Sequence, residues 1–298
     1  MFPKFMLVRK IINSLIQNDF EFVVCSGCFD IVARKEETLL IKALINVDAL
    51  KEEHANTLNT ISYFCSAYPF VISLKNGRDF LDDDTTYYRF GLPVMTPKLF
   101  DRILREDVVV KECLKGKYTV EIDAVLLRKR RKELNYTLQE LAEIVHISKK
   151  ALYEIENKRV KPTFETVEKL ERVLGVELKK PFKKKPGRKI YLKPKDEFQA
   201  KVNRKLKEIG VDNSPVHTSL FQIVGRIKQP IISCLCGNER HVKEKFELMK
   251  RVSNLFLSSF IFITKGEREE GIPTLTLKEL ESLSSPTDFM QILRERLN

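Results

Sequence analysis

The stretch that decides the fold lies near the middle of the chain and reads TLQELAEIVHISKKALYEIE from Thr137 to Glu156. Thr137, followed three residues later by Glu140, is the pattern of a capping box, which begins a helix. Ser148 is a second N-cap residue and begins a new helix. Apolar residues recur at helical spacing over 125–176. The pattern predicts four or five short helices, two of which are joined by a tight turn as in a helix-turn-helix motif.

The same run, continued through ENKRVKPTFETVEKLERVLGV, resembles the Cro and lambda-repressor type of helix-turn-helix domain. The resemblance implies an all-α, five-helix domain over 119–178, with the motif at 137–156 and a recognition helix at 148–156 that enters the DNA major groove. In that register Lys149, Lys150, Tyr153 and Glu154 would face base edges. Thr137, Gln139 and Ser148 would contact phosphates. The full set of candidate DNA-binding residues is Thr137, Gln139, Ser148, Lys149, Lys150, Tyr153, Glu154, Lys158, Arg159, Lys184 and Arg188.

Two residues depart from the pattern of that family. His146 stands where the turn glycine is usual, and Lys158 stands where a glycine usually follows the recognition helix. Both positions often need a positive φ angle, for which glycine costs least. The resemblance is therefore weakest at these two turns.

The positive charge is concentrated in the same part of the chain. The 298 residues carry 53 Lys and Arg against 41 Asp and Glu, a net charge of +12, and 124–195 alone holds 21 basic and 9 acidic residues. A basic segment between neutral flanks indicates a polyanion-binding module, with double-stranded DNA as the expected partner. Residues 179–195 read KKPFKKKPGRKIYLKPK, without an acidic residue. The segment 179–196 is interpreted either as a solvated linker or as a cationic arm in the minor groove or along phosphates.

The two flanking segments share a repeated pattern at an offset of 192 residues. CFDIVARK, which contains Phe29 to Arg34, recurs as LFQIVGRI, which contains Phe221 to Arg226. After a deletion of 12 residues in the second copy, GLPVMTPK (91–98) recurs as GIPTLTLK (271–278). The same register pairs Asn46 with Asn238, Phe64 with Phe256, Ser66 with Ser258 and Phe70 with Phe262. We interpret 1–118 and 197–298 as two homologous α/β domains, the second one shorter, on either side of the helix-turn-helix domain and the basic segment.

Within the first copy, strands alternate with helices, which implies a mixed or parallel sheet covered on both sides. The expected elements are a helix at 7–17, strands at 29–34 and 39–44, a helix at 50–64, strands at 69–73 and 93–95, and a helix from Pro97. This arrangement resembles the restriction-endonuclease-like, Holliday-junction-resolvase-like fold. The whole layout, with FDIVAR and LLIKALINVD before a Cro-type domain, resembles the archaeal family of helix-turn-helix transcriptional regulatory proteins, over the first 180 residues more closely than over the last 100.

The nuclease resemblance can be tested against its chemistry. Such enzymes need an Asp, and then an acid two residues before a Lys, to hold Mg²⁺ and assist the attacking water. Asp30 and Lys42 are in place, but the acid position is Leu40, and Glu37 or Asp48 would have to substitute for it. The corresponding residues of the second copy are Gln222, Ile232 and Cys234. We therefore expect a degenerate site without catalysis, in which Asp30 and Lys42 form a salt bridge.

Other functional classes find little support in the sequence. Six cysteines are too few for a disulfide scaffold, and the C-x-x-C of Cys25 and Cys28 lacks a second pair for zinc. The chain has no Gly-rich phosphate loop and no G-x-S-x-G motif. From these missing motifs neither a cofactor nor a metal is expected. No apolar run is long enough for a membrane span, and no signal peptide is evident, so we expect no membrane partner and a cytoplasmic location.

The sequence thus predicts a sequence-specific DNA-binding transcriptional regulator, with the α/β domains positioning the recognition helix or pairing chains. Repressors of this type usually dimerise, so a homodimer is expected unless the duplication already gives one chain a pseudo-twofold shape. The alternatives are a structure-selective nuclease or resolvase and a non-specific architectural DNA-binding protein. The target sequence, any effector, and the choice between activation and repression are outside what the sequence tells.

Overall fold

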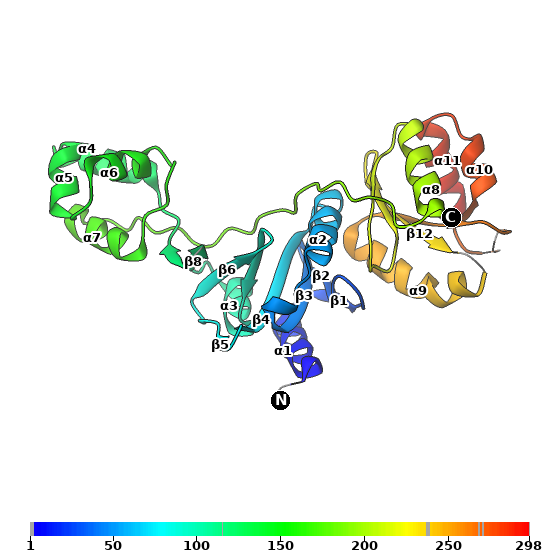
Figure 1. Ribbon diagram of the computed structural model, residues 1–298, viewed down its shortest axis with the longest axis horizontal. Helices are drawn as coiled ribbons and strands as arrows, with labels where there is room; N and C mark the ends of the chain where they lie inside the picture. The colour runs from blue at the N-terminus through cyan, green and yellow to red at the C-terminus, as the bar shows by residue number, and fades with distance from the viewer. Residues whose placement is uncertain (1–2, 115, 237–238, 268, 270, 298) are drawn as a thin grey trace.

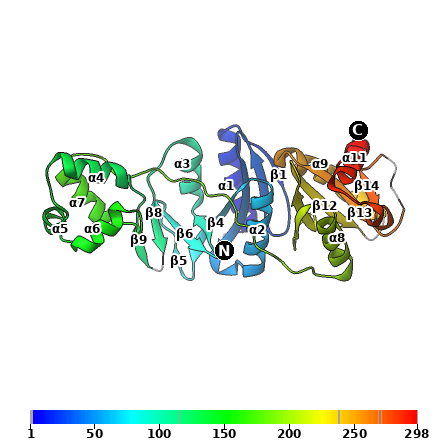
Figure 2. The same ribbon diagram turned by 90° about the horizontal axis from the view of Figure 1, so that it is seen from above.

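The computed structural model describes residues 3–114, 116–236, 239–267, 269 and 271–297, with the backbone alone for 239–241 and 297. Three lobes lie in a row, with the helix-turn-helix domain at one end and the second α/β domain at the other (Figures 1 and 2). The first α/β domain lies between them. None of the helices within these described residues has the length and apolar character needed to cross a bilayer.

The first α/β domain has a single twisted sheet covered by helices on both faces. Its elements are α1 (Lys4–Gln17), β1 (Glu21–Val24), β2 (Ile31–Arg34), β3 (Thr38–Asn46), η1 (Val47–Ala49), α2 (Glu52–Phe64), β4 (Tyr68–Asn76), β5 (Asp79–Phe80), β6 (Thr85–Arg89), β7 (Leu92–Met95), α3 (Pro97–Arg105), β8 (Lys111–Leu114) and β9 (Lys117–Thr119). The strand order is β1-β2-β3-β4-β7-β6-β8-β9, with β5 on β4. The predicted helices and strands are confirmed at these positions, and β1, β5, β6, β8 and β9 were not anticipated.

Alternation along the strands separates the two sides of this sheet. Ile31 and Ala33 of β2 face the core that contains α1 and α3, whereas Val32 and Leu40 face the core that contains α2. Side chains alternate between sheet faces in this way, so both faces of the central strands are apolar.

The helix-turn-helix domain consists of α4 (Ala124–Glu133), α5 (Leu138–Ile144), α6 (Lys149–Glu156) and α7 (Phe164–Leu174) around a core of its own. The prediction of a fifth helix in this domain is wrong, because residues 119–178, all of which the structure describes, contain four α-helices. The chain leaves α7 through Gly175 at φ 64° and becomes extended. Leu178 then accepts a hydrogen bond from the Asp123 amide at 2.8 Å, and Lys179 forms a β-bridge with Ile122. This pairing closes the domain where another helix would begin.

The second α/β domain repeats the pairing scheme of the first. Its elements are α8 (Glu197–Glu208), β10 (Asp212–Pro215), β11 (Ile223–Arg226), β12 (Pro230–Cys236), α9 (Glu239–Phe256), β13 (Ser259–Thr264), β14 (Thr274–Thr276), α10 (Leu277–Ser282) and α11 (Pro286–Leu297). The order β10-β11-β12-β13-β14 has two antiparallel pairs followed by two parallel pairs, as has β1-β2-β3-β4-β7. Descent of both domains from one ancestor stays a prediction, to which this common topology lends weight.

The offset of 192 holds in the hairpins and changes after the helices. Val32 pairs with Leu40 as Val224 pairs with Ile232. In the parallel pairs, however, Lys42 opposite Val71 corresponds to Cys234 opposite Phe262, an offset of 191 for the second residue. The predicted equivalences Phe64–Phe256, Ser66–Ser258 and Phe70–Phe262 are therefore wrong by one residue, because α9 and its entry differ in length from α2. The pair Asn46–Asn238 lies outside the described residues.

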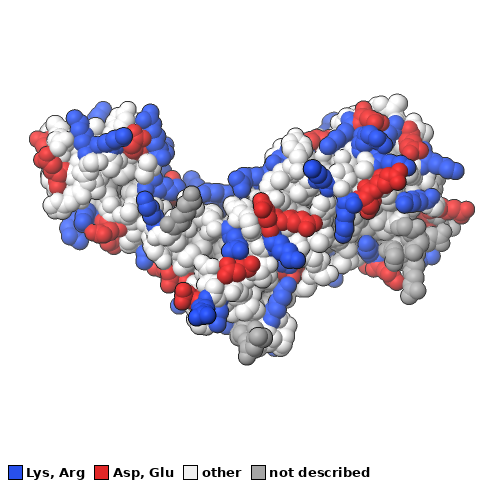
Figure 3. All heavy atoms as spheres, viewed as in Figure 1, with Lys and Arg blue, Asp and Glu red and all other residues white. Residues whose placement is uncertain are grey.

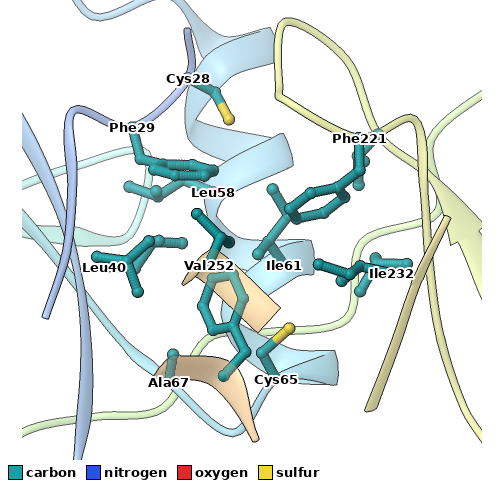
Figure 4. Close-up of a cluster of buried hydrophobic side chains, with 14 of the residues drawn as sticks. Cys28, Phe29, Leu40, Leu58, Ile61, Cys65, Ala67, Phe221, Ile232 and Val252 are labelled. Carbon is teal, nitrogen blue, oxygen red and sulfur yellow. The ribbon is translucent and has the colours of Figure 1, made fainter. Parts of the chain in front are cut away.

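The two α/β domains share one hydrophobic core (Figure 4). Helix α2 packs on β11 of the second domain, and α9 packs reciprocally on β1 and β2 of the first. The helix ends are joined in a similar way. Arg226 donates to the carbonyls of Tyr63 and Phe64 at the end of α2, and the Thr38 hydroxyl donates to the Leu255 carbonyl in α9 at 3.0 Å. The two domains thus pack reciprocally on each other within one chain.

Candidate nucleic-acid interface

The helix-turn-helix motif is built by side-chain caps. Thr137 Oγ1 accepts from the Glu140 amide at 3.1 Å, and Glu140 Oε2 accepts from the Thr137 amide at 2.7 Å. Both hydrogen bonds of the predicted capping box are present. Ser148 Oγ accepts from the Ala151 amide at 3.0 Å and begins α6. The sequence therefore placed both helix starts correctly.

The two turns that lack glycine keep the left-handed backbone. His146 has φ 59° and Lys158 has φ 60°. His146 donates its amide to the Glu143 carbonyl at 3.1 Å, and Lys158 donates to the Ile155 carbonyl at 3.0 Å. Local hydrogen bonds hold the turns although neither residue is glycine, at a conformational cost that glycine would avoid.

The outer face of α6 presents cations and one aromatic ring. Lys149 and Lys150 are exposed, and no carboxylate among the described residues forms an ion pair with either. Tyr153 is 43% exposed, and the Arg159 guanidinium lies 5.8 Å from the centre of its ring. Glu154 accepts from Arg159 at 3.4 Å, so this acid is already engaged. The lysines and Tyr153 are therefore better placed for base contacts than Glu154.

The three residues predicted to contact phosphates differ in whether their side-chain donors already have a hydrogen-bond partner. The Thr137 and Ser148 oxygens act as acceptors in the caps, which leaves each O–H free to donate to a phosphate. Gln139 is exposed, but its Nε2 donates to Glu143 Oε1 at 2.5 Å. This amide would have to exchange its partner on binding DNA.

A buried ion pair that sequence reasoning missed holds α6 in place. Arg131 of α4 forms a bidentate pair with Glu156 at the end of α6, with distances of 2.6 and 3.0 Å, and also donates to the Tyr136 carbonyl at 2.8 Å. Both side chains are almost fully buried. Arg128 approaches Glu156 at 3.3 Å. The available signal was spacing, because Arg131 and Glu156 each follow a buried leucine by four residues, on the core faces of their helices.

The helix-turn-helix domain is connected to the first α/β domain by more than the chain. Lys161 Nζ lies 2.8 Å from Glu112 and 2.7 Å from Glu121. Burial opposes its charge, but these two hydrogen bonds outweigh burial and raise the pKa of Lys161. Thr119 also forms a β-bridge with Thr163. The segment between α6 and α7 is therefore attached to the α/β body.

The face between these two domains is acidic. A cleft of about 610 Å³ lies between α7 and the β6–β8–β9 edge, lined by Asp82, Asp84, Glu165 and Glu168 with one lysine, Lys111. Repulsion by these carboxylates would direct a DNA backbone elsewhere on the molecule.

The basic segment is an ordered extended strap over 179–195 that crosses the first α/β domain. Phe182 packs into the core that contains α1 and α3, with its ring centre 6.4 Å from that of Phe70. The segment thus has packing contacts of its own, and its role as a linker or a cationic arm stays a prediction. Lys184 forms an ion pair with Glu37, whereas Arg188 is exposed and reaches the Phe90 carbonyl at 3.5 Å.

The nuclease-like site is closed by lysines. Asp30 is 6% exposed, and its Oδ1 accepts from Lys4 Nζ at 2.6 Å. Its Oδ2 lies 3.3 Å from Lys42 Nζ and accepts from the Ala43 amide at 2.8 Å. Leu40 is fully buried in the core shared by the two α/β domains, where an acid could not be solvated (Figure 4).

The substitute acids and the second copy give no alternative site. Glu37 and Asp48 lie beyond the two ends of β3, which carries Lys42, and Glu37 is paired with Lys184. Asp48 is instead paired with Arg89 at 2.7 Å. In the second domain Gln222 Oε1 accepts from the Leu235 amide at 2.8 Å, the backbone role that Asp30 performs toward Ala43. Among the residues that the structure describes, no group of three or more His, Cys, Asp or Glu could hold a metal ion.

Comparisons with known proteins agree with this geometry. Residues 5–110 match the model of a PD-(D/E)XK superfamily domain, and 127–180 match a helix-turn-helix model. Relatives named "Putative HTH-type transcriptional regulatory protein" are 28% identical in Methanothermobacter thermautotrophicus (97% of this chain, 96% of the relative), 28% in Archaeoglobus fulgidus (90% and 89%) and 25% in Methanococcus vannielii (97% and 97%). No solved structure matches the chain significantly. The predicted nuclease-like fold followed by a helix-turn-helix domain, and the resemblance to archaeal regulators, are confirmed.

Proposed function

We propose that the chain is a DNA-binding transcriptional regulator that reads a major groove with α6. The observation that carries this proposal is the pair Lys149 and Lys150, exposed and without an ion-pair partner among the described residues, at the start of capped helix α6 in a domain that matches a helix-turn-helix model. Lysine donates to the N7 and O6 acceptors of guanine, and a well-formed base contact contributes about 1–3 kcal/mol of discrimination.

The α/β body serves as a rigid support for this helix and not as a nuclease. Both oxygens of Asp30 are occupied by lysines, and the position of the second acid is a buried leucine. The buried pair of Arg131 with Glu156 fixes the angle of α6 on α4, and Lys161 connects that unit to the body. Mg²⁺-dependent cleavage of a four-way DNA junction would contradict this assignment, above all if Asp30→Ala abolished it.

Reading a palindrome requires two chains, because each chain carries one recognition helix. We infer that two chains bind half-sites about 10 bp apart on one face of the duplex. The two chains need not form a dimer in solution, because binding to adjacent half-sites is enough to bring them together on the DNA.

The test is selection of a random duplex library by the full chain at about 150 mM salt, where phosphate attraction is partly screened. An enriched motif is expected. Lys149→Ala and Lys150→Ala should weaken binding to that motif by about 5- to 150-fold while changing binding to unrelated duplexes much less. Lys278→Ala, an exposed lysine on α10, is the control and should change neither. Binding without enrichment would instead support an architectural protein.

A further inference from the structure

The strap has two sides with different roles. Some residues of the strap face the body and are engaged with it, whereas the side chains of others are exposed. Phe182 lies in a core, Lys184 pairs with Glu37, and the Ile190 carbonyl accepts from Thr60 at 3.0 Å. Leu192 packs against the core shared by the α/β domains. These contacts fix the backbone of the strap.

Gly187 is the point of closest approach. It is buried against α2, where a β-carbon would overlap the Asn59 carbonyl and the Ser62 side chain. Only glycine lets the strap lie this close to the helix backbone. The strap therefore has a defined seat on the body.

The outward side chains form a row of cations. These exposed residues are Lys183, Lys185, Arg188, Lys193 and Lys195. Within the described part of the chain none of them forms an ion pair with an acid, and Lys185 Nζ lies 5.5 Å from the centre of the Tyr88 ring. Figure 3 shows basic side chains gathered along the saddle between the lobes, where the strap runs in Figure 1.

We propose that this outward row is a preformed track for the phosphate backbone of duplex DNA next to the site read by α6. The proposal rests on the proposed function and extends it. The strap leaves the helix-turn-helix domain directly at Lys179, so the track continues from that domain. From Lys183 to Lys195 the extended chain covers about 40 Å, which corresponds to about 12 bp of duplex.

Because the backbone of the strap is fixed on the body, its exposed cations would bind phosphates at a lower entropic cost than those of a free tail. A free basic tail must be ordered when it binds, whereas this backbone is ordered by its inward contacts before DNA arrives. The proposal also corrects the candidate residues, because Lys184 belongs to the inward side and is replaced by Lys183, Lys193 and Lys195.

The test compares the salt dependence of binding for two double variants. The probe is a labelled mixed-sequence duplex of about 40 bp, titrated between about 50 and 300 mM KCl. K183Q/K193Q should flatten the log–log slope by about 1.8, since each lost phosphate contact removes about 0.9. K250Q/K278Q removes the same charge from exposed positions on α9 and α10 and should leave the slope nearly unchanged. Equal slopes for the two variants would overturn the proposal.

A second pair of probes separates this proposal from the proposed function. The sequence enriched by selection is made as a short duplex that covers the recognition site alone, and as one extended by about 12 bp on each side. K183Q/K193Q should weaken binding to the extended duplex only. Equal losses on both lengths would place these lysines at the recognition site and overturn the track, while preferential binding of both duplexes over unrelated DNA would still uphold the regulator.

Discussion

At the scale of single residues, the charges that matter most for the fold are buried and paired. Asp30 keeps the position that a nuclease would use for a metal, yet two lysines and a backbone amide occupy its oxygens. Gln222 performs the same backbone role without charge in the second domain. What the two positions share is a hydrogen-bond acceptor for the neighbouring strand, a structural role that needs no charge.

The ion pair of Arg131 with Glu156 gives the first prediction. Glu156→Ala should lower the free energy of local unfolding of α6 by about 3–5 kcal/mol, because it leaves a buried guanidinium without its partner. Hydrogen exchange of the α6 amides at pH 7 measures this change. Glu133→Ala removes exposed ion pairs of α4 and should cost at most about 1 kcal/mol. A loss for Glu156→Ala as small as that of the control would refute the positioning role.

Asp123 gives a prediction with a pH dependence. Hydrogen bonds from the Leu126 and Val125 amides, together with Lys180, lower the pKa of Asp123 in the folded state. Its contribution is therefore present above the unfolded pKa of about 3.9 and disappears as the pH falls through the folded value. Asp123→Ala should cost about 1 kcal/mol at pH 7 and progressively less below about pH 4.

Scanning calorimetry at several pH values checks this expectation. Asp123→Asn is the matched control, because asparagine caps helices about as well as aspartate and does not titrate. A difference between wild type and Asp123→Ala that stays constant down to low pH would show that the charge of Asp123 plays no part.

At the scale of elements, local patterns in the sequence were reliable and long-range packing was not. The capping box at Thr137 and the N-cap at Ser148 are signals within four residues, and both helices begin there. From sequence the strap could be a solvated linker or a cationic arm, because 9 of its 17 residues are basic and its few apolar residues follow no helix or strand period. Its packing depends on α2, which is distant in sequence. Strands β6, β8 and β9, at one side of the sheet, are short and largely polar, which leaves no periodicity to detect.

Gly187 tests the seat of the strap. Gly187→Ala should destabilise the seated strap by about 1–3 kcal/mol through overlap with α2, which corresponds to a 5- to 150-fold rise in the population of the open state. Faster tryptic cleavage after Lys183 and Lys184 and faster amide exchange in the strap are expected. Gly266→Ala is the control, since no atom lies near its added β-carbon. Unchanged cleavage of Gly187→Ala would mean that the strap does not depend on this contact.

At the scale of the whole molecule, the repeat in the sequence predicted two related domains but not how they pair. The hairpin register followed from FDIVAR and FQIVGR, because strand residues repeat with a fixed offset. The shared core did not follow, since apolar residues such as Phe29 and Leu58 look the same in sequence whether they face their own domain or another. The same holds for the candidate site: the exposed lysines of α6 could be predicted from local sequence, whereas the buried Arg131–Glu156 pair, which depends on packing between helices, was missed.

The pairing of the two α/β domains leads to the last prediction. Reciprocal packing of α2 on β11 and of α9 on β1 and β2 buries these apolar faces within one chain, so they are not available to join a second chain. The chain without DNA should therefore sediment as a monomer of 34.7 kDa at micromolar concentration, and two chains should assemble only on a duplex with two half-sites. Sedimentation velocity with one-site and two-site duplexes measures both states. A stable dimer in the absence of DNA would show that another surface joins the chains, and a single chain on the two-site duplex would show that the internal pairing also limits assembly on DNA.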